Sequence, residues 1–273
     1  MEKTTKKKSY GLLIVGAILL IAGIVFSVYA YNTSYQESKL AEDAAVKLSL
    51  QRPYSYGLTT VFFAVLLTCK GLYNALVGVT AAAKADVKKL AQAGLLAALC
   101  YIGFAFLKID IPVGPEKTAF HFGNVFCVLA ALLIGGYWGG LAGAVGMTIG
   151  DLTTAYVTSA PKTFLLKLCI GLIAGFVAHK IFKLSKEHDK KHTTIATIVS
   201  CACGMGFNII ADPLVGYFYK MYLLGVPQDI SSALAKMGAL TTSVNAVVAV
   251  IAASVIYLAL RPAMKKAGLF VEL

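Results

Sequence analysis

The feature that most constrains this chain is a series of eight apolar segments, each of about 18 or more residues, the length needed to cross a bilayer as a helix. Hydrophobic residues make up 58% of the sequence and charged residues only 14%, which is too apolar for a soluble domain of this length. A transmembrane barrel would show alternating segments of about ten residues, and none is seen. The sequence therefore predicts an all-α, polytopic membrane protein, with spans near residues 10–31, 57–79, 90–107, 120–137, 139–159, 163–180, 194–216 and 237–260.

The lysines and arginines indicate how these spans are oriented. Most lie in four connections that the spans place on one side, at residues 3–8, 84–89, 180–191 and 261–266. Since cytoplasmic loops carry such an excess, both termini are predicted to be cytoplasmic. The same bias explains the net charge of +12, so no nucleic-acid partner is needed to account for it.

Two N-terminal segments leave alternatives open. Residues 10–31 follow a basic start, as in a signal peptide, but the apolar run is longer than that of a cleaved signal, so we interpret it as a retained anchor. Residues 57–79 carry Lys70 near the middle. An ammonium is costly at that depth, so the segment either crosses with Lys70 snorkelling or paired, or re-enters.

Composition divides the chain into two predicted parts. Residues 1–87 would hold two spans, a polar external connection at 32–55 that forms a hairpin or a short helix, and a basic link. Residues 88–273 would hold six spans joined by tight turns, forming one bundle. Glycines at four-residue spacing, such as Gly135, Gly139 and Gly143, predict close helix packing there.

Seven polar or charged residues lie in or near the ends of the bundle's spans, away from the basic connections. Such groups are expensive in hydrocarbon, and a one-sided cluster indicates a small-molecule site. The Lys167 ammonium would bind a substrate oxygen or phosphate, snorkel toward the membrane surface, or pair with Asp151 or Asp212. The candidate substrate-binding residues are His121, Asn124, Asp151, Lys167, Asn208, Asp212 and Asn245.

Several of these residues also have structural interpretations. His121 and Asn124 are expected one turn apart on the fourth span, where Asn124 would either contact a ligand ring nitrogen or cap the helix. Asn208 and Asp212 share a helix face, and Pro213 offers a kink or span end as a reason for that polarity. The six cysteines fall in apolar spans and are interpreted as buried hydrophobes, not metal ligands or disulfides.

From Lys88 onward the sequence resembles the substrate-binding S component of an energy-coupling factor (ECF) vitamin transporter, most closely the riboflavin, pyridoxine and hydroxymethylpyrimidine branch. The passages that carry the similarity are Phe120-His-Phe-Gly-Asn124 with the glycine-rich stretch after it, Gly150-Asp151, and Pro161-Lys-Thr-Phe-Leu-Leu-Lys167 with Gly171 and Gly175.

The resemblance implies a six-helix membrane bundle, without a cofactor, that captures a water-soluble vitamin or precursor from outside. Such a subunit works with a separate coupling protein and two ATPases. The first external loop, here Lys108 to Ala119, would close over the site. The small-residue pair Ala93 and Ala97, near the start of the first bundle helix, would contact the coupling protein.

Other functional classes are less well supported by the sequence. A stand-alone secondary transporter, the alternative, would show repeated halves with paired broken helices, and no convincing repeat is seen. An intramembrane enzyme would need a metal-binding HExxH or a nucleophile with its base, and the sequence has neither. It also has no P-loop pattern for ATP. The sequence predicts a vitamin-capturing subunit but suits a pyridine, a pyrimidine or a flavin equally well.

Overall fold

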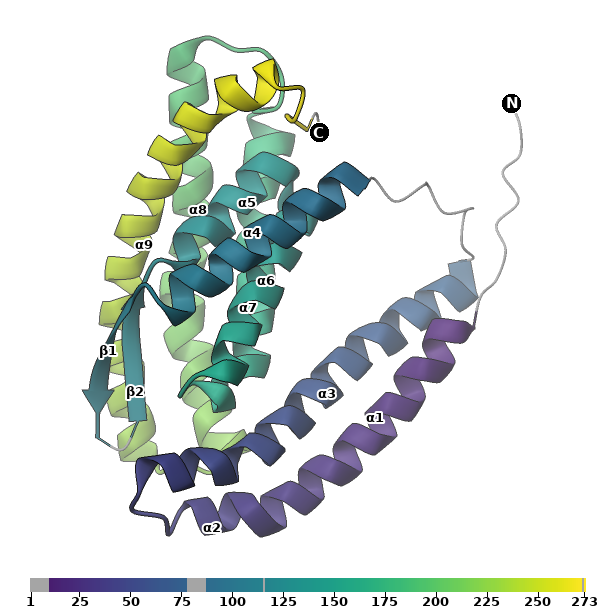
Figure 1. Cartoon of the computed structure of the whole chain (residues 1–273), viewed down its shortest axis with the longest axis vertical. Coiled ribbons are helices and arrows are strands. Elements are labelled where there is room, and N and C mark those ends of the chain that lie inside the picture. Colours follow the sequence, from purple (N-terminus) through teal and green to yellow (C-terminus); the bar gives the residue numbers. More distant parts are fainter. Residues whose placement is uncertain (1–9, 78–86, 115, 272) are drawn as a thin grey trace. The chain divides into compact units, whose positions relative to one another are not determined.

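The computed structural model describes residues 10–77, 87–114, 116–271 and 273 (Figure 1). The chain forms two compact units, one of Met1–Asp86 with Val157–Pro161 and the other of Val87–Tyr156 with Lys162–Leu273. The described residues do not include the N-terminal lysines at 3–8, most of the basic link, or Pro115 of the predicted external loop. The side chain of Lys70 is likewise not described.

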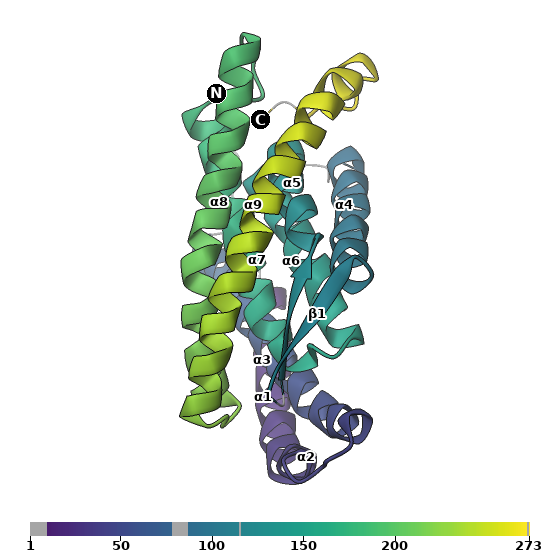
Figure 2. The same ribbon diagram turned by 90° about the vertical axis from the view of Figure 1, so that its left-hand side faces the viewer.

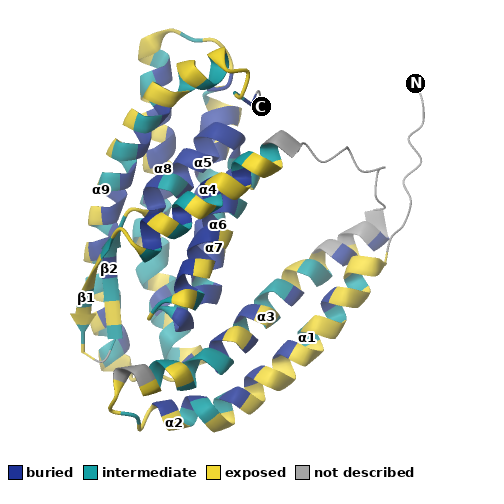
Figure 3. Ribbon diagram, in the orientation of Figure 1, coloured by how far each residue is buried: buried dark blue, intermediate teal, exposed yellow. Residues whose placement is uncertain are grey.

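The first unit contains a pair of packed helices. Helix α1 (Gly11–Ala30) continues through a π-helical turn (Tyr31–Tyr35) into α2 (Gln36–Ser38), and α3 spans Ala44–Val77. The α1 surface is largely exposed and apolar, yellow in Figure 3, as expected of a helix that faces lipid. Where α1 packs on α3, a Cβ on Gly16 would come within 2.6 Å of the Thr68 nitrogen, so the glycine permits this close approach.

The polar connection at residues 32–55, interpreted from the sequence as a hairpin or a short helix, is helical for most of its length. Helical structure continues to Ser38 and resumes at Ala44, so only residues 39–43 are non-helical. The rings of Tyr31, Tyr35 and Tyr54 pack with centroids 4.7 to 5.6 Å apart. This aromatic cluster ties the end of α1 to the first turns of α3, which extends both helices beyond their apolar runs.

The second unit is a helical bundle with one β-hairpin. Helices lie in all six predicted ranges, and α8 and α9 pack side by side (Figure 2). Across the described residues, four helical segments are long and apolar enough to cross a membrane, namely Gly11–Ser38, Val157–Ile181, Lys190–Leu223 and Gln228–Lys266. The prediction of a mainly helical membrane fold is confirmed. The elements are α4 (Val87–Ala105), β1 (Lys108–Val113), β2 (Glu116–His121), α5 (Gly123–Ile134), α6 (Gly136–Thr153), α7 (Ala160–Phe176), α8 (Lys190–Phe218) and α9 (Gln228–Lys266), with π-helical turns at Val177–Ile181 and Tyr219–Leu223.

The segment predicted as an external loop is an antiparallel hairpin in which Lys108 pairs with His121 and Val113 with Glu116. The strands turn at Gly114, whose φ of 59° suits glycine. His121 therefore ends β2, and the prediction that it lies one turn from Asn124 on a helix is wrong. Because the hairpin takes up the start of the predicted span, α5 has only 12 residues, about 18 Å, and is too short to cross a hydrocarbon core of about 30 Å.

Helix α5 lies at the centre of this unit and is buried along almost its whole length, dark blue in Figure 3. Glycines bring the surrounding helices close together. A Cβ on Gly171 would overlap the backbone of Gly140, and a Cβ on Gly146 would overlap the carbonyl of Ala97. The predicted glycine packing is confirmed, because α6 meets α7 and α4 at distances that larger residues would prevent.

Successive helices of the second unit run in alternating directions, which gives it two distinct ends. The hairpin end holds the hairpin, the starts of α5, α7 and α9, and the ends of α6 and α8. The basic end holds the connection from α7 to α8 and the end of α9. There, Arg261 donates hydrogen bonds to the carbonyls of Leu184 (3.2 Å) and Lys186 (2.8 Å), and Lys265 pairs with Glu187.

Candidate functional site

A buried lysine lies in the hairpin-end half of the bundle. Lys167 is on the second turn of α7, and only 6% of its surface is exposed. Its charge interacts with Asp212 and Asp151, but within the described part of the chain no carboxylate lies within ion-pair distance of its ammonium. The predicted alternative, in which Lys167 pairs directly with one of these aspartates, is not what the structure shows.

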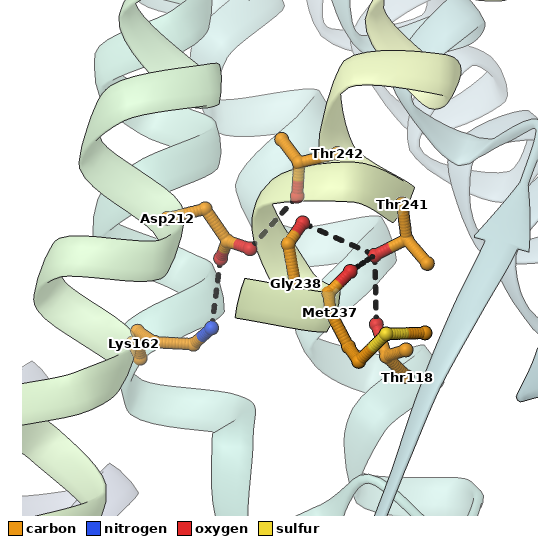
Figure 4. A network of polar contacts seen from close by, with 7 residues as sticks. All are labelled: Thr118, Lys162, Asp212, Met237, Gly238, Thr241 and Thr242. Carbon is orange, nitrogen blue, oxygen red and sulfur yellow. Dashed lines mark hydrogen bonds and ion pairs between the residues drawn. The ribbon is translucent and has the colours of Figure 1, made fainter. Parts of the chain in front are cut away.

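Asp212 instead pairs with Lys162, one residue after Pro161 at the start of α7 (Figure 4). The Lys162 ammonium donates to Asp212 Oδ1 at 2.7 Å, and the Thr242 hydroxyl donates to Asp212 Oδ2 at 3.1 Å. These contacts join α7, α8 and α9. Sequence reasoning missed Lys162 because it counted that lysine as an external loop charge. The sequence did hold a signal for this pair, because Lys162 lies at the start of one span and Asp212 lies near the outer end of another.

On the helices and strands of this half of the bundle, five buried side-chain atoms have no hydrogen-bond partner among the described residues. A buried polar atom without a partner costs about 1 to 3 kcal/mol, so several together indicate that an absent polar group satisfies them. Asn124 does not cap α5, because Phe122 occupies the cap position without a side-chain bond. The five atoms are His121 Nδ1, Asn124 Oδ1, Thr148 Oγ1, Asp151 Oδ2 and Asn208 Oδ1.

Electrostatic and ring contacts show which of these residues are neighbours. His121 interacts with the charges of Lys167 and Asp212, and Asp151 interacts with those of Lys162 and Lys167. The Phe104 ring lies edge-on to His121, with centroids 5.0 Å apart. The structure thus brings His121, Asp151, Lys167 and Asp212 together, from β2, α6, α7 and α8.

Asn245 is fully engaged with the hairpin. Its Oδ1 accepts the His121 backbone N–H at 3.0 Å, and its Nδ2 donates to the Ala119 carbonyl at 3.0 Å. The side chain therefore pairs with β2 as a neighbouring strand would. The oxygen and the nitrogen of its amide together fix the position of the hairpin against α9.

Further contacts hold the hairpin on its other sides. The Tyr156 hydroxyl lies 2.9 Å from Asp110 Oδ1, to which it donates. The Lys220 ammonium pairs with Glu116 at 3.1 Å, and the hydroxyls of Thr118 and Thr241 lie 2.9 Å apart (Figure 4). Sequence reasoning missed these contacts, since they depend on a hairpin that it interpreted as a loop.

The predicted coupling-protein pair lies on the inner side of α4. Ala93 is 8% exposed and belongs to the core, and the Ala97 carbonyl packs against Gly146. The neighbouring pair Gly94 and Ala98 has the same four-residue spacing and is exposed. A Cβ on Gly94 would meet nothing within 4 Å, so this second pair forms the open small-residue face of α4.

The described residues contain no group of three or more His, Cys, Asp or Glu side chains arranged to hold a metal ion. Cys100, Cys127 and Cys201 are buried, whereas Cys69 and Cys203 are exposed. The polar groups of the site are amides, a hydroxyl, an imidazole, carboxylates and an ammonium. This set can bind the ring edges and hydroxyl groups of a polar organic molecule.

Comparison of the sequence with protein-family models identifies the family of the chain. Residues 84–262 match the family described as ECF-type riboflavin transporter, S component. Searches of curated proteins and of solved structures gave no significant match. The matched range covers the whole bundle up to the last turns of α9 and well over half of the chain. The chain therefore belongs to the ECF-type riboflavin transporter S-component family, whose members are substrate-binding membrane subunits of a transporter and not enzymes.

Proposed function

We propose that this chain captures a flat, water-soluble heterocyclic vitamin of the riboflavin class at the hairpin end of the bundle. The observation that carries the proposal is the group of five buried polar atoms without partners, found in the same half of the bundle as a buried, unpaired Lys167. A heteroaromatic ring with carbonyl, ring-nitrogen and hydroxyl groups has the complementary donors and acceptors.

The residues at the site take two kinds of role. Lys167 binds a carbonyl or other electron-rich oxygen of the ligand, Asn124 and Asn208 contact ring edges, and Asp151 accepts a ligand hydroxyl. His121 contributes a further ring nitrogen beside Phe104. Asp212 and Asn245 position the site, since the carboxylate is held by Lys162 and Thr242 and the amide is held by β2.

We propose that the hairpin, whose residue His121 belongs to the site, acts as its lid. Its contacts with Tyr156, Lys220, Thr241 and Asn245 are individually weak hydrogen bonds and ion pairs. A set of such contacts can open and close together without unfolding the helices beneath. Ligand entry then requires that the hairpin separate from α9, Tyr156 and Lys220.

The proposed partners are an energy-coupling membrane protein and two ATPase subunits, as the family implies. We propose that the coupling protein contacts α4 through Gly94 and Ala98, adjacent to the predicted pair Ala93 and Ala97, because Gly94 and Ala98 are the exposed small residues. A Gly94→Trp variant should bind vitamin normally and lose uptake when the partners are co-expressed. Ile251→Trp, at a position on α9 that is also exposed, should keep both. Normal uptake by Gly94→Trp would exclude this face.

We propose that both termini are cytoplasmic, which places the hairpin end outside. The basic connections support this orientation. We further propose that residues 1–87 are an extension added to the six-helix domain of residues 88–273. A fluorescent protein that folds only in the cytoplasm, fused after Leu273, should fluoresce. An alkaline phosphatase fusion at the same point should be inactive, and active phosphatase would reverse the orientation.

The capture function is tested by titrating the purified protein with riboflavin, pyridoxine and hydroxymethylpyrimidine. Loss of one charge-assisted hydrogen bond costs about 1.5 to 3 kcal/mol, so Lys167→Ala should weaken binding roughly tenfold to hundredfold. Lys191→Ala, at the basic end, is the matched control. Absence of binding to all three vitamins would contradict the proposal, as would unchanged affinity in Lys167→Ala. Uptake by the chain alone in proteoliposomes would favour a stand-alone transporter.

A further inference from the structure

A cavity lies at the basic end of the bundle, away from the proposed vitamin site. Its volume is about 600 Å³, within the range of small-molecule pockets. The turn between α5 and α6 forms one wall, the last turns of α7 form another, and the side chain of Leu273 lies over part of it. The lining is almost entirely apolar, so the cavity suits a hydrocarbon group and not a water-soluble vitamin.

Glycines form the contact between α6 and α7 at this end. A Cβ on Gly175 would overlap the backbone of Gly136, and a Cβ on Gly136 would lie 3.1 Å from the Leu172 carbonyl oxygen. Gly135, with a φ of 87°, turns the chain between α5 and α6 without adding a side chain. Tyr137 and Phe176, 62% and 59% exposed, border the cavity at the surface.

Two polar groups accompany this apolar lining. Lys180 is exposed and lines the cavity. His179 is 7% exposed, its Nε2–H donates to the Ala131 carbonyl at 3.0 Å, and its Nδ1 has no partner in the described part of the chain. Lys183 and Lys186 follow in the connection to α8. The ligand that matches this arrangement has an apolar chain, a polar linkage and a negative charge.

We propose that this cavity binds one acyl chain of an anionic phospholipid, with the phosphate against Lys180 and a polar group of the lipid next to His179. Charge complementarity distinguishes this occupant from a neutral lipid, since basic pockets between membrane helices select anionic headgroups. Tyr137 and Trp138 border the cavity and belong to the aromatic residues that gather where headgroups begin. The site therefore sits at the depth where a lipid offers both its chain and its phosphate.

The test uses the full chain in detergent with added phosphatidylglycerol or phosphatidylcholine of identical acyl chains, and native mass spectrometry to count retained lipid. The wild type should retain phosphatidylglycerol preferentially. Removing one cation near a lipid phosphate is worth about fivefold, so Lys180→Glu should reduce the preference at least fivefold. Lys191→Glu makes the same charge change at the same end outside the cavity lining and should keep the preference.

A second variant separates chain binding from charge. Ile173→Trp places a larger side chain in the cavity lining and should reduce retention of both lipids, whereas Leu165→Trp, exposed on the same helix, should not. Phosphatidylglycerol with a photoreactive acyl chain should crosslink to Tyr137 or Phe176. Equal retention by all variants, or crosslinks spread over the whole helical surface, would overturn the site. Protection of the cavity by the coupling protein, with no bound lipid, would make it a protein-docking surface instead.

Discussion

Asn245 should control how firmly the hairpin is closed, and the effect should be visible before any ligand is added. Its amide makes two hydrogen bonds to β2, at His121 and Ala119, each 3.0 Å long. Asn245→Ala removes both and leaves a backbone N–H and a carbonyl without partners. Asn245→Asp keeps an acceptor for the His121 N–H but loses the donor to Ala119, so its effect should be intermediate.

The magnitude follows from the two bonds. Each net hydrogen bond contributes about 1 to 1.5 kcal/mol, so together they stabilise the closed hairpin by about 2 to 3 kcal/mol. At about 1.4 kcal/mol per factor of ten, the ratio of closed to open hairpin should fall about 30- to 160-fold in Asn245→Ala. Vitamin dissociation should accelerate by a similar factor if opening of the lid limits release.

Hydrogen exchange of the ligand-free protein measures this directly. Amides of residues 116–121 should exchange faster in Asn245→Ala, whereas amides of α6 should be unchanged. Ser243→Ala is the matched control, because the Ser243 hydroxyl bonds only to the Ala239 carbonyl of its own helix. Wild-type exchange rates in the hairpin of Asn245→Ala would refute the assignment of this residue as the hairpin's anchor, whatever happened to vitamin affinity.

Three further predictions concern stability. Gly171→Val should lower the melting temperature strongly, because its Cβ would overlap the Gly140 backbone. In the control Gly206→Ala the added Cβ would have no atom within 4 Å and should not lower it, and equal melting temperatures for the two variants would contradict the packing argument. Lys162→Met should destabilise the protein by about 3 kcal/mol by leaving the partly buried Asp212 without its cation. Adding Asp212→Asn should restore part of the loss, and an unchanged unfolding midpoint would show that solvent replaces the pair. The Lys265 ammonium donates to Glu187 and lowers the pKa of that exposed carboxyl. The ion pair therefore stabilises the protein above the ordinary glutamate pKa, and this contribution is lost as pH falls through the lowered pKa. The melting-temperature difference between wild type and Glu187→Gln should disappear in acid, and a difference that grew in acid would contradict this sign.

The helices of the second unit were predictable because membrane spans leave little choice of structure. A long apolar run must satisfy its own backbone hydrogen bonds, and an α-helix does so locally. The hairpin was not predictable in this way. Its residues 108–121 mix charged, proline and apolar positions, a pattern that also describes a loop, and pairing between β1 and β2 depends on contacts with α9 and Tyr156. The start of α5 was misplaced for the same reason, since Phe120 extends the apolar run while belonging to β2.

The candidate site was predictable in its composition but not in its pairing. Depth along a helix follows from residue spacing, so Lys167 and Asp212 were correctly placed toward the same end of the bundle. Which lysine faces the carboxylate depends on helix rotation and tilt, which spacing does not determine. The same limit applies to α4, where a shift of one residue rotates a side chain by about 100°. That rotation separates the buried Ala93 from the exposed Gly94.

The two lysines of α7 show how the site divides its charges. Lys162 has a carboxylate at 2.7 Å and joins three helices, so its charge stabilises the scaffold. Lys167 lies five residues further along and is buried without such a partner among the described residues. An unpaired ammonium and five unpartnered polar atoms destabilise the empty protein. On the proposed function, a ligand that satisfies them would recover that free energy on binding. Tight capture of a dilute vitamin would then be compatible with hairpin contacts weak enough to open.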